Sequence, residues 1–135
     1  GVSLSDCNLK RSDSGFTFRI SPSLMASRWS ADAGAGADSA SEVTLVPHAR
    51  YVWDVGPTKL DLMFGIGLSY VSETNIGRRV KSTEFQFSDE LGIGISDASE
   101  RVRLGYSYRH VSNANIDTPN NNVDFHGFTL TFRIP

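Results

Sequence analysis

Three polar residues near the carboxyl end of the chain have the types and the spacing that acyl-transfer chemistry requires. His110 and Ser112 are two residues apart, and in a β-strand such residues project to the same face. Asp124 follows a polar loop, and antiparallel pairing around that loop places it opposite His110 on this face. The three side chains could form a relay in which the carboxylate orients the imidazole, the imidazole removes the serine proton, and the serine oxygen attacks an acyl carbon.

The loop at residues 113–122 contains donors that such a reaction also needs. Aimed N–H groups stabilise the negative oxygen of a tetrahedral intermediate, and three side chains could supply them together with the loop backbone: Asn113, Asn115 and Asn120. A histidine and a serine two residues apart also occur by chance, so the alternative is a polar cluster at the end of a strand. His126 shares the face of Asp124 and either competes with His110 for the carboxylate or is a surface residue.

The elements that carry these residues are long strands with a period of two. Apolar residues alternate with small or polar ones at residues 16–27, 43–55, 59–71, 85–96, 101–112 and 124–134. Such segments are about twice the usual globular strand of about 5 to 6 residues and suit the roughly 9 to 11 residues that cross a bilayer at a tilt. No segment has a helical period, so the chain is predicted to be all-β. Asp89 falls on an apolar face and implies a bulge or a local polar contact.

The connections between these segments alternate in length. Residues 55–58 and 97–100 are tight turns, whereas the stretches at 31–42, 72–82 and 113–122 are long and polar. Bacterial barrels alternate short periplasmic turns with long external loops in this way. The sequence therefore predicts an antiparallel up-and-down transmembrane β-barrel of the eight-stranded type. Residues 2–5 form the tail of a further strand, which makes seven visible strands, and we expect the first strand to be missing from this chain.

Composition argues against several other classes of protein. A length of 135 residues suits a single domain, residues 1–135, and a net charge of −2 argues against nucleic-acid binding. The lone Cys7 cannot form an internal disulfide, and no Cys/His spacing predicts a metal site. The sequence shows neither an 18-residue apolar run nor a signal-peptide pattern.

The carboxyl-terminal third resembles the PagL family of lipid A deacylases. The resemblance lies in the block RHVSNANI from Arg109 to Ile116, the step from Pro119 to Asn120, Asp124, and the closing FRIP. It extends upstream through FGIGLSY and FSDELGIGI and covers most of the chain after about residue 43. This resemblance implies an eight-stranded barrel, integral to the bacterial outer membrane, whose active site faces the lipid.

The resemblance also implies a reaction and residue roles. The family hydrolyses the ester at the 3 position of lipid A and releases a 3-hydroxy fatty acid, with no metal or organic cofactor. Ser112 would be the nucleophile, His110 the base and Asp124 the acid that orients it, while Asn120 and Asn113 match oxyanion positions. The acid is commonly Glu in the family, so the shorter Asp124 must come closer to His110. Asn115 stands where glycine is common.

Basic residues gather in the predicted external loop, at Arg78, Arg79 and Lys81. They could contact the phosphates of lipid A, or the loop is simply solvated. Lipopolysaccharide and membrane lipids are the expected partners, and homodimerisation stays open. Two functions compete with ester hydrolysis: a small non-enzymatic outer-membrane barrel, structural or adhesive, and a soluble lipocalin-like binder with an apolar interior and a polar exterior.

Overall fold

The computed structural model describes residues 1–3, 6–12, 15–31, 34 and 36–133. Within these ranges every regular element is a strand, and no helix is long and apolar enough to cross a membrane. The absence of helices from these ranges confirms the all-β prediction. The long strands have 10 to 17 residues. In chain order the strands are β1 (Val2–Ser3), β2 (Cys7–Ser12), β3 (Phe16–Ser30), β4 (Ser39–Val55), β5 (Thr58–Val71), β6 (Asn75–Ile76), β7 (Arg79–Val80), β8 (Phe85–Asp97), β9 (Val102–Ser112) and β10 (Val123–Phe132).

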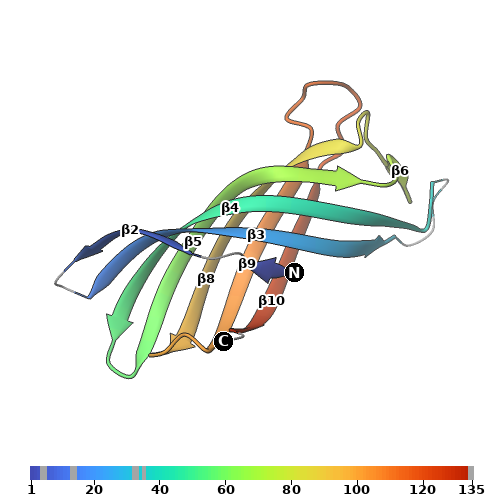
Figure 1. Cartoon of the computed structure of the whole chain (residues 1–135). Coiled ribbons are helices and arrows are strands. Elements are labelled where there is room, and N and C mark those ends of the chain that lie inside the picture. The colour runs from blue at the N-terminus through green and yellow to red at the C-terminus, as the bar shows by residue number, and fades with distance from the viewer. Residues whose placement is uncertain (4–5, 13–14, 32–33, 35, 134–135) are drawn as a thin grey trace.

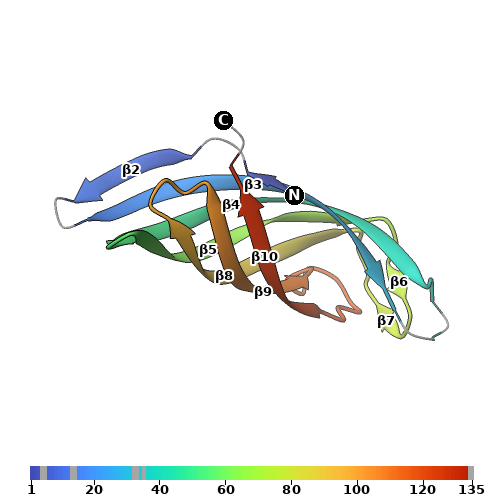
Figure 2. The same cartoon turned by 90° about the horizontal axis from the view of Figure 1, so that it is seen from below.

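Eight of these strands form one antiparallel sheet in which chain neighbours are also neighbours in space. The order is β1-β3-β4-β5-β8-β9-β10, and β2 also pairs with β3. The short β6 and β7 form a separate hairpin inside the connection from β5 to β8. Figures 1 and 2 show the sheet curling so that β1 lies beside β10, although among the described residues the ladder of β10 is with β9 alone. The predicted up-and-down arrangement is confirmed, and the expected absence of a first strand stays a prediction.

The curled sheet is apolar outside and polar inside. Along β5 the large apolar side chains are between 38% and 58% exposed: Leu60, Leu62, Phe64, Ile66 and Leu68. Asp61 and Ser69, on the other face of the same strand, are buried. This distribution is typical of a barrel whose exterior meets lipid. It is the reverse of the lipocalin-like alternative, which requires an apolar interior.

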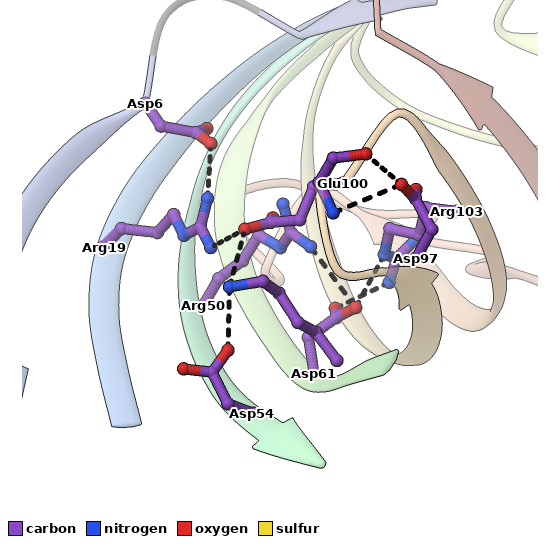
Figure 3. A network of polar contacts seen from close by, with 10 residues as sticks. Asp6, Arg19, Arg50, Asp54, Asp61, Asp97, Glu100 and Arg103 are labelled. Carbon is purple, nitrogen blue, oxygen red and sulfur yellow. Dashed lines mark hydrogen bonds and ion pairs between the residues drawn. The ribbon is translucent and has the colours of Figure 1, made fainter. Parts of the chain in front are cut away.

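Ion pairs fill the interior at the end with the tight turns (Figure 3). We call this set the turn-end network: Arg19, Arg50, Lys59 and Arg103 with Asp6, Asp54, Asp61 and Glu100. Asp61 accepts two hydrogen bonds from Arg103, at 2.8 and 2.7 Å, and lies 3.3 Å from Arg50. Gly94 makes room for the guanidinium of Arg103, because a Cβ on residue 94 would overlap Nη2 of that arginine. Strands far apart in sequence are therefore joined by charge.

A second polar cluster lies inside the barrel toward the long loops. Glu42 of β4 is fully buried and bonds to both Nη atoms of Arg109, at 3.1 and 2.9 Å. The indole Nε1 of Trp29 donates to the same carboxylate at 2.9 Å, and the hydroxyl groups of Ser27 and Ser69 complete its shell. The buried carboxylate is therefore neutralised by a guanidinium and fully hydrogen-bonded, as a buried charge must be.

Candidate active site

Pairing between β9 and β10 brings the predicted base and acid into contact. Asp124 is the register partner of His110, and the distance from its Oδ1 to Nδ1 of the imidazole is 2.7 Å. Tyr108 donates its hydroxyl to the same Oδ1 at 2.8 Å. An ionised carboxylate can only accept, so the ring proton resides on Nδ1 and the lone pair on Nε2. The short Asp124 side chain thus reaches His110, and Nε2 is the atom free to act as a base.

Ser112 lies at the end of β9, opposite Phe87 of β8, and is 8% exposed. Its Oγ accepts a hydrogen bond from the backbone N–H of Ala114 at 3.4 Å. The described side chains of Ser112 and His110 share a strand face but make no hydrogen bond to each other. Residues two apart on a strand are separated by about 6.6 Å, a distance that rotation of the two side chains can bridge.

The loop after Ser112 begins with a tight backbone turn. Ala114 and Asn115 both have positive φ, at 53° and 60°, the left-handed region that few side chains adopt readily. The N–H of Ile116 donates to the carbonyl of Asn113 at 3.1 Å and closes the turn. This turn directs the N–H of Ala114 back toward the Ser112 hydroxyl.

The three predicted oxyanion asparagines bond mainly to one another. Asn120 accepts the backbone N–H of Asn113 at 3.0 Å and donates from Nδ2 to Asn115 at 3.0 Å. The buried Asn113 amide donates to Ser82 at 2.7 Å and to the carbonyl of Asp117 at 2.8 Å. These contacts brace the loop, and the backbone donor aimed at Ser112 belongs to Ala114, which sequence reasoning did not single out.

Asp89 is a polar residue of the outer face that sequence reasoning left between two explanations. The register of β8 is unbroken at this position, so the bulge is excluded. Asp89 lies directly opposite His110 on the side away from Asp124. The outer wall therefore carries acid, imidazole and acid in one row across three strands.

His126 does not compete for the carboxylate. Its Nδ1 lies 3.0 Å from the hydroxyl of Tyr106, and its ring stacks on that tyrosine at 6.3 Å between centroids. The structure thus leaves Asp124 to His110 and Tyr108. No group of three His, Cys, Asp or Glu side chains that could hold a metal ion occurs in the described part of the chain.

Two of the three basic residues predicted to meet phosphate, Arg79 and Lys81, contact residues 120–122. Lys81 forms an isolated bridge with Asn120, and Arg79 donates to the carbonyl of Asn122. The Lys81 ammonium is buried and donates to Gln86 at 3.1 Å and to the carbonyl of Val111 at 3.3 Å. Burial, and then repulsion by Arg79, lower the pKa of Lys81 to about 8, although Glu42 raises it.

Comparison with known proteins identifies the family and the fold. The sequence model of the family described as lipid A 3-O-deacylase (PagL) matches residues 6–133. Lipid A deacylase PagL of Bordetella bronchiseptica is 31% identical over 114 residues, which is 84% of this chain and 62% of that relative, so the chain spans less than two thirds of its length. The crystal structure of the outer membrane enzyme PagL shares the fold with a TM-score of 0.79 at 20% identity, covering 98% of this chain and 87% of that one. The chain belongs to the PagL family of lipid A 3-O-deacylases.

Proposed function

We propose that this protein is a serine-type carboxylic ester hydrolase of the outer membrane that removes the acyl chain ester-linked at the 3 position of lipid A. Family membership supports the substrate class, and the apolar exterior supports a place in the membrane. The observation that carries the proposal is the 2.7 Å contact between His110 and Asp124 on the outer wall, two residues from Ser112.

The geometry supports a two-step acyl transfer. Ser112 Oγ forms a bond to the acyl carbon as its proton moves to Nε2 of His110, and the carbonyl electrons move to the oxygen. The intermediate collapses, the bond to the sugar oxygen at position 3 breaks, and His110 returns the proton to that oxygen. Water then repeats both steps at the acylated serine, which releases the free fatty acid and restores Ser112.

Asp124 and the turn after Ser112 have separate tasks in this scheme. Asp124 holds the proton of His110 on Nδ1 and stabilises the imidazolium that forms. The N–H of Ala114, already within 3.4 Å of Ser112 Oγ, donates to the negative oxygen of the intermediate. Asn113 and Asn120 keep this turn in place through the bond between them.

The placement on the outer wall suits a lipid substrate. Exposed apolar side chains flank the site, among them Ile116 at 73% and Phe128 at 79%. An acyl chain that lies against them stays in an apolar environment throughout the reaction. The substrate therefore need not leave the outer leaflet to reach Ser112.

Acyl release from lipopolysaccharide by the detergent-solubilised protein tests the proposal. We expect free 3-hydroxy fatty acid with the native chain and a loss of at least about 10³-fold with Ser112→Ala. Ser107→Ala is the matched control, because Ser107 belongs to the same strand but to its opposite face. Undiminished release by Ser112→Ala would exclude the serine mechanism. No release by the native chain would favour the non-enzymatic barrel.

A further inference from the structure

Three cations surround one cavity at the loop end of the barrel. The cavity has a volume of about 610 Å³ and lies between the end of β3, the hairpin of β6 and β7, and the start of β10. Its walls combine apolar and basic side chains, including Trp29, Ile76, Phe125, Arg78, Arg79 and Lys81. Positive charge is thus concentrated around a space large enough for a ligand.

These three cations have no carboxylate within 4.0 Å in the described part of the chain. Lys81 donates to an amide oxygen and a carbonyl, Arg79 to a carbonyl, and Arg78 has neither an ion pair nor a hydrogen bond among the described residues. Neutral acceptors leave the charge of a cation uncompensated. Among the described residues, therefore, no carboxylate pairs with the three cations that line the cavity.

The surroundings of Lys81 independently support an excess of positive charge at the cavity. It is 3% exposed, lies 6.0 Å from the centroid of the Trp29 ring, and has its pKa lowered to about 8 by burial and by Arg79. An anion in the cavity would attract the ammonium and offset both effects.

The cavity and the candidate acid Asp124 lie on opposite faces of the first residues of β10. Val123 and Phe125 of β10 line the cavity, whereas Asp124 between them bonds to His110 on the outer wall. Arg79 reaches the carbonyl of Asn122 and acts electrostatically on Asp124. A ligand whose anionic group enters the cavity can therefore lay its acyl chains over the barrel rim and along the outer wall.

We propose that this cavity binds a phosphate monoester and that the phosphate belongs to the headgroup of the lipid A being deacylated. Arg78 and Arg79 present planar donors that suit phosphate oxygens, and the ammonium of Lys81, which also lines the cavity, adds a third positive charge. The proposal rests on the function proposed above, since it assigns the site a second point of contact with the same lipid. Phosphate in the cavity would hold the sugar while the ester lies at Ser112.

The kinetic test compares lipid A with the same lipid after its phosphates have been removed. With Arg78→Ala/Arg79→Ala we expect KM for the phosphorylated lipid to rise about tenfold, as for lost charge-assisted hydrogen bonds, and kcat to stay within about twofold. KM for the dephosphorylated lipid should not change. Arg28→Ala is the matched control, because Arg28 is an exposed arginine at the same end of the barrel that does not line the cavity.

A binding test separates this proposal from the proposed function. Ser112→Ala protein, which cannot turn over the lipid, should bind the phosphorylated form about tenfold more tightly than the dephosphorylated form. The double arginine variant in this background should lose the difference. Equal binding of the two lipids, or a difference that survives the double variant, would overturn the phosphate site. Discrimination by a native chain that hydrolyses neither lipid would support the cavity and refute the esterase.

Inorganic phosphate identifies the source of the bound group. We expect millimolar phosphate to displace the phosphorylated lipid only weakly, because the lipid also makes apolar contacts with the outer wall. Displacement by micromolar phosphate would show that the cavity is built for the free ion and would overturn the assignment to a lipid headgroup.

Discussion

The two ends of the barrel hold their charges in opposite ways. At the turn end, each cation of the turn-end network has a carboxylate within 4.0 Å, and Asp61 at its centre is buried. At the loop end, the partners of Arg78, Arg79 and Lys81 among the described residues are neutral acceptors or none, and the side chains of His110 and Asp124 are 28% and 45% exposed. Charges at the turn end hold strands together, whereas those at the loop end are the ones that we propose to contact a ligand.

This contrast follows from the connections between the strands. Tight turns at residues 55–58 and 97–101 leave little backbone between neighbouring strands, so charged side chains meet across the lumen. Long connections at 72–84 and 113–122 instead pack on each other, with Asn121 donating to the carbonyl of Val80 at 3.3 Å. Substitutions at the turn end should therefore change stability, and those at the loop end should change activity.

Replacing Asp124 should give the largest loss of activity, and it tests most directly whether the loop end serves activity rather than stability. Asp124→Asn removes the charge that holds the proton on Nδ1 of His110, and an amide can instead donate to that nitrogen and leave the wrong tautomer. We expect kcat for acyl release to fall by about 10³-fold, with an unchanged thermal unfolding midpoint. Asp124→Glu is the control and should retain most of the activity. A large loss of stability with Asp124→Asn would contradict the division between the two ends.

Replacing Asp61 should show the opposite behaviour at the turn end. Asp61→Asn leaves Arg103 and Arg50 without their shared carboxylate inside the barrel, and removing one partner of a buried ion pair typically costs about 3–5 kcal/mol. Unfolding by urea in lipid vesicles measures the change in free energy, and kcat should stay near the native value. Asp54→Asn is the control, because that carboxylate is 41% exposed in its contact with Lys59 and should change stability by less than about 1 kcal/mol. Equal losses of unfolding free energy from Asp61→Asn and Asp54→Asn would show that burial of the carboxylate does not determine its contribution to stability.

The sequence predicted the wall of the barrel better than its loops. Alternation of apolar and polar residues was sufficient to assign the exposed face of β5 and to place Asp124 opposite His110, because both depend only on strand parity and register. The site residues in the loop depend on contacts that no periodicity encodes. The positive φ of Ala114, which aims its N–H at Ser112, and the burial of Lys81 under the loop appear only once the connections pack together.

The smallest expected effect concerns the pH dependence of the phosphate cavity. The groups that face Lys81 are the Arg79 guanidinium, the Glu42 carboxylate, the Gln86 amide, the Trp29 ring and the carbonyl of Val111. Guanidinium and carboxylate groups keep their charge between pH 7 and 9, and a phosphate monoester has lost its second proton by pH 7. Only the ammonium, with a pKa of about 8, therefore changes charge in this interval.

Because a lowered pKa means that Lys81 is charged below about pH 8 and neutral above it, affinity for phosphorylated lipid A should fall as pH rises through that value. We expect a decrease of about threefold between pH 7 and 9, since two arginines remain at the cavity. Binding to Ser112→Ala protein at a series of pH values measures it. Lys81→Gln keeps a donor for Gln86 and Val111 but cannot titrate, so its weaker affinity should be constant across the series. If the affinity of Lys81→Gln protein fell in the same way between pH 7 and 9, another group would be the one that titrates. Lys81 would then not contact the phosphate.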